Sequence, residues 1–221
     1  MACSGGALQE APAPLCHDEQ ASIGFMAPAR LAEFSQGRQH ARTALAQLGL
    51  ADASIPMAAD RSPVWPPGFV GSISHVPADR VSNQPGQVLA VVARARDCAG
   101  LGVDLERTGR LMPEHWPAFM SAAERAWLAL RPAGQRSPLA HGLWSAKEAV
   151  MKALVRPMDP HAIDIRVLGD GRAFVAEWRG PQAGDVAEAA GLSGWLTFGN
   201  GWVLALATLQ TPQTRPAARA G

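Results

Sequence analysis

Two short segments, GVDLE at 102–106 and LWSAKEAVMKAL at 143–154, constrain this chain more than any other part of its sequence. The first contributes two carboxylates, and the second contributes one carboxylate and two lysines. Carboxylate oxygens suit Mg²⁺, which usually takes a few of them and completes its coordination shell with substrate phosphates and water. Lysines add positive charge beside a phosphate. Together the two segments indicate an enzyme that handles phosphate groups.

The spacing of these charged residues places them on defined faces. Asp104 and Glu106 lie two residues apart, so on a β-strand their side chains leave the same face. Glu148 and Lys152 lie four residues apart on a predicted helix, where such positions are neighbours. Each pattern alone also fits a structural explanation: a solvated strand end for the acidic pair, and a helix-stabilising ion pair for Glu148 with Lys152.

The bulk composition is that of a folded protein without a strong overall charge. Hydrophobic residues make up 48% of the 221 residues and charged residues 18%, which fits a globular protein. A chain of this length can form one domain or two lobes of about 100 residues each. The formal net charge of +1 gives no field that would attract nucleic acid or an anionic membrane. Any basic binding site must therefore be a local cluster.

Cysteines and apolar runs indicate the compartment. Three cysteines without a CxxC spacing suit reduced thiols, and the scattered histidines form no zinc motif. No apolar run approaches the roughly 18 residues that a membrane-spanning helix needs. The N-terminus lacks the basic and apolar regions of a signal peptide. We therefore expect a cytoplasmic protein without a membrane span.

The first half of the sequence predicts one helix followed by strands. Residues 1–22 are rich in Ala, Pro and Gly and are expected to be loosely ordered. An apolar face with helical spacing runs from Pro28 to Leu48, and Gly49 is a plausible stop. An irregular, proline-rich stretch follows at 51–69. Three strands are then predicted, at 71–75, 88–96 and 101–106.

Two helices are predicted next. Ser121 is a good N-cap, and Glu124 at N3 completes a capping box, which explains Glu124 by a structural role alone. The pair Ser137-Pro138 is predicted to open a second helix, with proline at its first position. This helix is expected to run until Pro157.

The remaining sequence predicts β-hairpins. Glycine-containing turns at 169–171 and 199–201 are good hairpin signals, and the tail from Pro212 onward is expected to fray. The order helix, strands, helices, hairpins predicts an α+β fold of mainly antiparallel sheets packed with helices. Each half carries helix and strand segments, which suggests two similar lobes, 1–100 and 101–221. The expected late strands are 162–168, 172–178, 194–198 and 202–209.

An ordered set of segments between residues 28 and 155 carries a family resemblance. The set comprises RLAEFSQGRQHAR, RSPVWPPG, GSISH, GVDLE, FMSAAERAWL and WSAKEAVMKAL. Its specific part is GVDLE followed about forty residues later by WSAKEAVMK, with SISH upstream. In these segments the chain resembles the Sfp-type 4′-phosphopantetheinyl transferases, and within them the EntD-like branch.

The resemblance implies a transferase with a pseudo-dimeric fold of two lobes. Such enzymes move the 4′-phosphopantetheine group of coenzyme A to a serine of an apo acyl or peptidyl carrier protein and release adenosine 3′,5′-bisphosphate. A monomer with Mg²⁺ and coenzyme A in the cleft between its lobes is expected. The resemblance does not decide which carrier protein is modified. It can belong to fatty-acid, polyketide or nonribosomal-peptide synthesis, siderophore synthesis included.

By the same resemblance, Asp104, Glu106 and Glu148 are the expected Mg²⁺ ligands. Glu148 has a second implied role as the general base for the incoming serine, directly or through a metal-bound water. The sequence leaves both roles of Glu148 open. The chemistry agrees with the residue types, because Mg²⁺ neutralises charge on a diphosphate leaving group while lysine adds positive charge at the phosphoryl group under attack.

The resemblance also implies coenzyme A contacts from several elements. Arg30 and Arg38 match two arginines that hold the 3′-phosphate, a task that suits the planar, bidentate guanidinium. His75 matches a histidine at the coenzyme A phosphates, and Ser74 either donates a hydrogen bond there or caps a turn. The other implied contacts are Arg61, Lys147 and Lys152.

Some of these residues have ordinary alternatives. Lys147 and Lys152 also fit a solvent-exposed helix face, and both lysines are implied to take part in catalysis only by the surrounding pattern. Arg61 equally fits a charge on a surface loop. Arg42 fits an ion pair one turn beyond Arg38, and Trp65 is expected to pack beneath the pocket.

Two other functions compete with the transferase. A Mg²⁺-dependent phosphodiesterase or nuclease would use the same carboxylates, but the net charge of +1 and the lack of a basic, aromatic-rich tract give no nucleic-acid footprint. A non-catalytic homologue that only binds carrier proteins would have no reason to keep Asp104, Glu106, Glu148 and Lys147 together.

Overall fold

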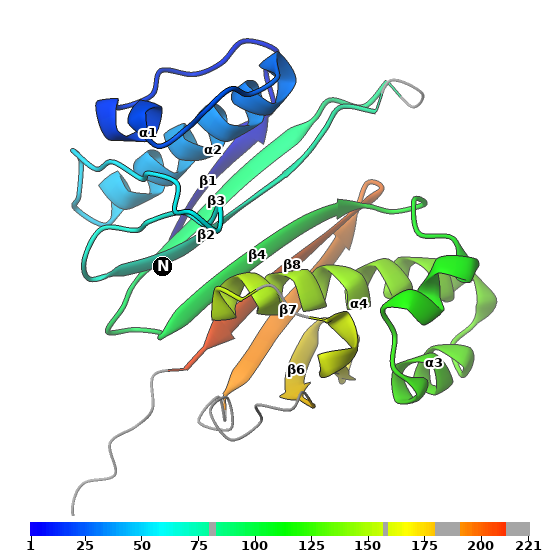
Figure 1. Cartoon of the computed structure of the whole chain (residues 1–221). Coiled ribbons are helices and arrows are strands. Elements are labelled where there is room, and N and C mark those ends of the chain that lie inside the picture. The colour runs from blue at the N-terminus through cyan, green and yellow to red at the C-terminus, as the bar shows by residue number, and fades with distance from the viewer. Residues whose placement is uncertain (80–82, 157–158, 180–190, 211–221) are drawn as a thin grey trace, which may run out of the picture.

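The chain forms two antiparallel sheets, each covered by a long helix on one face (Figure 1). The α+β class predicted from the sequence is confirmed. Within the residues that the structure describes, the sheets contain three and five strands, so the two halves differ in size. The computed structural model describes residues 1–79, 83–156, 159–179 and 191–210.

Helix α2 packs on the three-stranded sheet, whose strand order is β1-β3-β2. Small and aliphatic side chains meet in this core, among them Ala41, Leu45 and Val92, all fully buried. The helix spans Pro28–Gln47 and is followed by Gly49 at a φ of 89°, so both of its expected ends are confirmed. The strands are β1 (Ala2–Ala7), β2 (Phe69–Val76) and β3 (Gln87–Arg94).

The expectation of a loosely ordered N-terminus is wrong. Strand β1 pairs with β3 along its whole length, and helix α1 (His17–Ala21) follows it. The segment ACSGGA lacks strong strand formers, so its sequence gave little β signal. Its small residues fit a close approach of the backbones, since a Cβ added at Gly5 would lie 2.7 Å from the carbonyl oxygen of Val88.

Helix α4 (Ala133–Leu154) packs on one face of the five-stranded sheet, whose order is β4-β8-β7-β6-β5. The helix approaches β4 very closely, because a Cβ at Gly102 would lie only 1.8 Å from the carbonyl oxygen of Ala149. The expected hairpins at 169–171 and 199–201 are confirmed. The strands are β4 (Gly100–Arg107), β5 (Ile163–Leu168), β6 (Ala173–Trp178), β7 (Leu192–Gly199) and β8 (Trp202–Leu209).

The predicted start of this long helix is wrong. It begins at Ala133, so Pro138 lies inside it rather than at its first position. An internal proline removes one backbone hydrogen bond. Burial of Ala140 and Leu143, two and five residues after Pro138, favours the continuous helix. The helix ends at Leu154, ahead of the predicted stop at Pro157, which lies outside the described residues, as does the tail from Pro212.

The described part of the second half also contains the short helical elements η1 (Pro113–Ala118), α3 (Ala122–Ala129) and η2 (Pro160–Ala162). The capping box of α3 is confirmed, because Ser121 Oγ accepts a hydrogen bond from the Glu124 backbone and the Glu124 carboxylate accepts one from the Ser121 backbone. No helix in the described part of the chain is long and apolar enough to cross a membrane.

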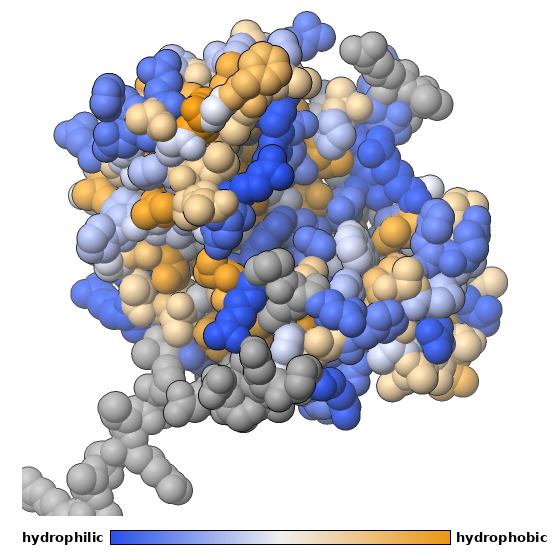
Figure 2. Space-filling view, in the orientation of Figure 1, coloured by the Kyte–Doolittle hydropathy of each residue, from blue (hydrophilic) through white to orange (hydrophobic). Residues whose placement is uncertain are grey.

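The two halves meet along β2 and β4, which lie side by side in Figure 1 but belong to different sheets. An apolar cluster that includes Val91, Leu101 and Val103 fills the space between the sheets. In the same view, hydrophilic side chains gather in a hollow near the middle of the surface (Figure 2). Strand β3 belongs to the first sheet and strand β4 to the second. The expected division at residue 100 into two similar lobes stays a prediction.

Candidate active site

Asp104 on β4 lies at the centre of the candidate site. Its side chain is 6% exposed, and Oδ1 lies 2.7 Å from Lys152 Nζ on α4 and 3.3 Å from Ser74 Oγ on β2. The second oxygen, Oδ2, is buried and has no hydrogen-bond partner among the described residues. One carboxylate therefore joins three elements and keeps one acceptor atom open.

Close packing and two hydroxyl groups fix this arrangement. Gly102 lets α4 lie directly on β4, two residues before Asp104. Ser145 Oγ then donates a hydrogen bond of 3.1 Å to the Asp104 carbonyl oxygen. On the other side, Ser74 Oγ accepts a hydrogen bond of 3.0 Å from the Leu105 backbone, which ties β2 to β4.

Two further carboxylates, Glu106 and Glu148, lie beside Asp104 and are half-buried. Burial raises the pKa of Glu106, and the negative charge of Asp104 raises it further. The pKa of Glu148 is raised by the same two causes. Trp144 donates an indole hydrogen bond of 3.3 Å to Glu106 Oε1. Three carboxylates thus repel one another in a partly desolvated place, which favours a cation between them.

The donor set fits a hard divalent cation in its chemistry. All three side chains offer oxygen ligands, and Asp104 Oδ2 is an open, buried acceptor. Lys152 supplies positive charge to the other oxygen of Asp104. Within the described residues, no three His, Cys, Asp or Glu side chains are already grouped closely enough to hold a metal ion.

A pocket of about 540 Å³ opens next to these residues, between the loop at 60–65, strand β2 and the end of α4. Trp65 lies against β2, where Gly71 leaves room for it, since a Cβ there would lie 2.7 Å from the indole ring. The lining combines charged and apolar side chains, notably Arg61, Trp65, Ile73, Glu148, Met151 and Lys152. The structure therefore brings Arg61, Glu148 and Lys152 together at one pocket, while their roles stay predictions.

The backbone of the 60–65 loop presents Arg61 to the pocket. Asp60 Oδ1 accepts hydrogen bonds from the backbone and the hydroxyl group of Ser62, at 3.0 and 2.6 Å. Arg61 between them has a φ of 72°, a left-handed conformation that side-chain-bearing residues adopt infrequently. Left-handed residues in such loops are often associated with functional sites.

Arg30 and His75 meet on the face of β2 that also carries Gly71 and Ile73. Arg30 Nη1 lies 2.8 Å from His75 Nε2, and both nitrogens lie 3.0 Å from Glu33 Oε2. Burial lowers the pKa of His75, while the charge of Glu33 opposes this shift. These two expected phosphate contacts are thus adjacent to each other, and their neighbour Ser74 reaches Asp104.

Arg38 is not placed with Arg30. Its side chain is buried, stacks at 4.2 Å over the Phe34 ring, and donates a hydrogen bond of 2.8 Å to the Ile55 carbonyl oxygen. Burial lowers the pKa of Arg38 to about 10. Because the guanidinium group is covered by protein, the structure does not present it to a ligand phosphate.

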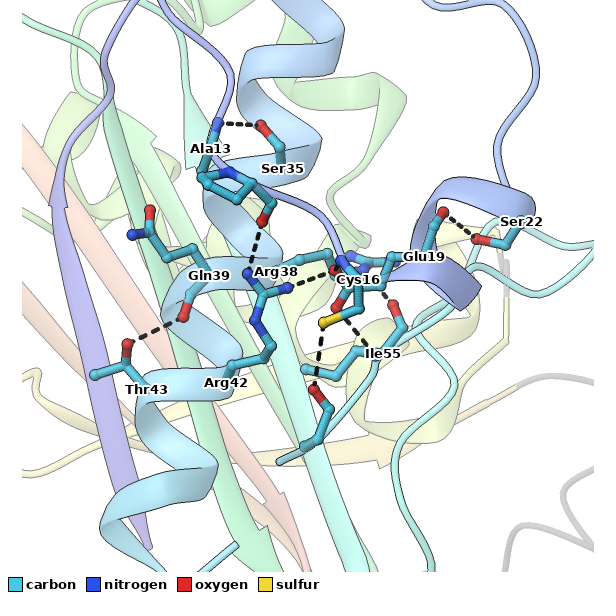
Figure 3. A network of polar contacts seen from close by, with 12 residues as sticks. Ala13, Cys16, Glu19, Ser22, Ser35, Arg38, Gln39, Arg42, Thr43 and Ile55 are labelled. Atoms are coloured by element: carbon cyan, nitrogen blue, oxygen red, sulfur yellow. Dashed lines mark hydrogen bonds and ion pairs between the residues drawn. The ribbon is translucent and has the colours of Figure 1, made fainter. Parts of the chain in front are cut away.

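The N-terminal segment covers this part of α2 through a polar network that the sequence did not indicate (Figure 3). Glu19 is fully buried and accepts hydrogen bonds from the backbones of Cys16 and Ile55, at 2.9 and 3.1 Å. It also forms an ion pair with Arg42, which confirms the expected ion-pair role of that arginine. Arg42 in turn donates a hydrogen bond of 2.8 Å to the Pro14 carbonyl oxygen.

Lys147 does not line the pocket. Its ammonium group is fully buried, 2.8 Å from Glu124 Oε2 and 2.7–2.8 Å from the carbonyl oxygens of Phe119, Pro160 and Ile163. Successive helix residues are about 100° apart, so Lys147 and Lys152 project from well-separated directions on α4. The structure therefore does not support the expected phosphate contact by Lys147.

Two supporting residues were not assigned to the site from sequence. The indole of Trp144 reaches Glu106, and the hydroxyl group of Ser145 holds the Asp104 backbone. The i, i+4 spacing of Trp144 and Glu148 on α4 was a usable signal, because such residues share a helix face.

Comparison with known proteins identifies the family. Residues 18–80 match the model of the 4′-phosphopantetheinyl transferase N-terminal domain. Residues 100–207 match the model of the 4′-phosphopantetheinyl transferase superfamily. The chain belongs to this superfamily. The two matched regions contain all the site residues discussed above, from Arg30 in the first to Lys152 in the second.

Two curated proteins are similar to part of the chain. It is 41% identical over 140 residues to the 4′-phosphopantetheinyl transferase Svp of Streptomyces mobaraensis, covering 62% of this chain and 52% of that protein. It is 35% identical over 144 residues to enterobactin synthase component D of Salmonella typhi, with the same coverage. The similarity thus spans about half the length of these curated relatives.

A solved structure with a partly similar fold is the holo-[acyl-carrier-protein] synthase of Thermotoga maritima. The TM-score is 0.41 at 17% sequence identity, and the match covers 52% of this chain and 64% of the synthase.

Proposed function

We propose that this chain is a 4′-phosphopantetheinyl transferase that uses coenzyme A and Mg²⁺. Its reaction transfers the 4′-phosphopantetheine group to a serine of an apo acyl or peptidyl carrier protein and releases adenosine 3′,5′-bisphosphate. The observation that carries the proposal is that Asp104 lies beside Lys152 and Glu148, and that these last two residues line the pocket. The family supports the same activity.

The pocket suits a ligand with both charged and apolar parts. Arg61 and Lys152 supply positive charge for a diphosphate, and Trp65, Ile73 and Met151 supply apolar surface for the uncharged parts of coenzyme A. Arg30 and His75 are the proposed contacts of a further phosphate, because His75 follows the pocket-lining Ile73 on the same face of β2. Ser74 positions Asp104 rather than capping a turn, because its hydroxyl group contacts that carboxylate.

Asp104, Glu106 and Glu148 would hold Mg²⁺, which when bound would reduce the negative charge on the diphosphate. The serine oxygen of the carrier attacks the phosphorus next to the pantetheine arm, and the bond from this phosphorus to the bridging oxygen breaks. That oxygen leaves on adenosine 3′,5′-bisphosphate. Lys152 places positive charge beside the group under attack.

Glu148 is the proposed acceptor of the serine proton. Burial and the charge of Asp104 raise its pKa, which brings a carboxylate closer to the basicity that general-base catalysis requires. Glu148 also lines the pocket, where the serine hydroxyl would have to arrive. Its carboxylate can act as a ligand, as a base, or as both in turn.

For Lys147 and Arg38 we propose supporting roles. Lys147 holds α4 to α3 and to the start of β5, and so fixes the helix that carries Glu148. Arg38 holds Ile55 in the segment that leads to the pocket loop at 60–65.

The proposed form in the cell is a cytoplasmic monomer.

One assay tests the transferase against its alternatives. The protein is incubated with coenzyme A, Mg²⁺ and an apo carrier protein, and the intact mass of the carrier is measured. The expected result is a gain of one phosphopantetheine group that disappears without Mg²⁺ or in Asp104→Ala and Glu148→Ala. Matched variants with an exposed carboxylate removed, such as Glu114→Gln, should retain the gain.

The alternatives predict different products. A phosphodiesterase would cleave coenzyme A without any carrier and leave the carrier mass unchanged. A non-catalytic homologue would bind the carrier with no change in either molecule. Undiminished transfer by Asp104→Ala would contradict the assigned role of that carboxylate.

A further inference from the structure

Three side chains form a compact charged triangle beside the candidate active site. Arg30 and Glu33 come from the first turns of α2, and His75 comes from β2. Arg30 Nη1 and His75 Nε2 each lie 3.0 Å from the same oxygen of Glu33, and the two nitrogens are 2.8 Å apart. Two basic groups therefore converge on one carboxylate oxygen.

The three contacts cannot all be favourable at once. A single ring nitrogen of histidine either donates or accepts a hydrogen bond. If His75 Nε2 donates to Glu33, its N–H faces the N–H of Arg30; if it accepts from Arg30, its lone pair faces the carboxylate. The most favourable arrangement is the one in which Arg30 and His75 both donate a hydrogen bond to the same oxygen of Glu33. The contact between the Arg30 and His75 nitrogens is then the unfavourable one.

The triangle is accessible and borders the site. The side chain of Arg30 is 46% exposed and that of His75 28%, while Glu33 between them is only 15% exposed. Ser74, next to His75 in β2, contacts Asp104. A ligand anion that approaches Arg30 and His75 from solvent thus meets a carboxylate already placed between them.

We propose that Glu33 is an internal counter-ion whose carboxylate oxygen occupies the place of a ligand phosphate oxygen between Arg30 and His75. By competing with the phosphate, Glu33 lowers the affinity for coenzyme A. This inference rests on the proposed function, which assigns Arg30 and His75 to a coenzyme A phosphate. On binding, the phosphate replaces the carboxylate, and Glu33 has to turn away from both basic groups.

The test compares coenzyme A binding by isothermal titration calorimetry in three proteins. In Glu33→Gln the side chain keeps its size but loses its charge, so coenzyme A should bind roughly two- to tenfold more tightly than to the wild type. Glu114→Gln, which removes an exposed carboxylate from η1, should bind like the wild type. Equal or weaker binding by Glu33→Gln that is repeated in Glu33→Ala would overturn the inference.

A second variant guards against an amide that still bridges the pair. Glu33→Ala removes the acceptor altogether and should also bind coenzyme A more tightly than the wild type. Circular dichroism and thermal unfolding establish that both variants keep the fold. Weaker binding by both would identify Glu33 as a residue that positions Arg30 and His75 for the ligand, and would contradict the competing role.

A different probe separates this inference from the proposed function. If coenzyme A binds neither wild type nor variant, inorganic phosphate is titrated instead, with the ring signals of His75 observed by NMR. Tighter phosphate binding by Glu33→Gln would then uphold the counter-ion role while the transferase function fails. Unchanged phosphate binding would overturn the counter-ion role as well.

Discussion

The ammonium group of Lys152 lies 2.7 Å from Oδ1 of Asp104, and this ion pair joins α4 to β4 at the centre of the candidate active site. The carboxylate is nearly buried, whereas the lysine side chain is 32% exposed and lines the pocket. The lysine thus neutralises a buried charge from the side on which a ligand enters.

This pair should contribute measurably to stability. Lys152→Met leaves Asp104 unpaired and should lower the free energy of unfolding by about 1–3 kcal/mol, below the loss for a fully buried pair. Asp104→Asn combined with Lys152→Met should cost less than the two single changes together, because they remove the same interaction. Urea unfolding measures these energies. Arg166→Met, which breaks an exposed pair with Glu177, serves as control. Fully additive losses would contradict the coupling.

Lys147→Met should act on folding rather than on ligand contact. The change leaves the Glu124 carboxylate and three carbonyl oxygens without their buried partner, and should cost about 3–5 kcal/mol of unfolding free energy. Glu124→Gln in the same chain should recover part of the loss, since it removes the unpaired charge. Urea or thermal unfolding provides the measurement. Wild-type stability together with lost transferase activity would instead restore the phosphate-contacting role.

The contact between α4 and β4 should tolerate no side chain at residue 102. In Gly102→Ala the new Cβ would meet the Ala149 carbonyl oxygen, so α4 has to move and stability should fall by about 1–3 kcal/mol. Carrier modification should fall as well, because α4 carries Glu148 and Lys152. Gly134→Ala, on the same helix with open space around its Cβ, should be neutral or slightly stabilising. Equal effects of the two changes would argue against the close approach.

His141 should make stability depend on pH. Its Nε2 accepts hydrogen bonds from the backbones of Arg110 and Leu111, at 3.1 and 3.0 Å, so the folded state favours the neutral ring. Burial lowers the pKa of His141 below its ordinary value of 6.5. The unfolded chain therefore takes up this proton first, and stability present above pH 6.5 is lost as the pH falls towards the lowered value.

Urea unfolding over a pH series checks this expectation. His141→Asn should have a smaller decrease in stability between neutral and mildly acidic pH than the wild type. His17→Asn, which removes a ring that is 94% exposed, should keep the wild-type dependence. The same slope for His141→Asn as for wild type would contradict the assignment.

Much of the fold could be predicted because its signals are local. The apolar run at 88–93, the apolar face of α2 and the glycine turns of the hairpins depend on neighbouring residues, and the strand, helix and hairpins expected from them were confirmed. Strand β1 was missed because ACSGGA has no apolar alternation and is stabilised by pairing with a strand 80 or more residues away in sequence. The start of α4 was missed because burial overrides the local effect of Pro138.

For the site, the sequence predicted which residues take part better than it predicted where their side chains point. Asp104 and Glu106 share a strand face, so their proximity followed from spacing. Lys147 and Lys152 belong to one motif, but only the latter points to the pocket, which helical angles alone could have suggested. The burial of Arg38 depends on the N-terminal segment folding back over α2, a long-range contact without a local signal.

The contact between β2 and β4 has a mechanical consequence. The described parts of these strands share no ladder of backbone hydrogen bonds, so the seam depends on side chains such as Ser74 and on the apolar cluster between the sheets. A ligand that contacts both halves holds β2 and β4 together. Ligand binding in the pocket then couples the unfolding of the two sheets. The cooperativity of unfolding therefore reports whether the pocket is occupied.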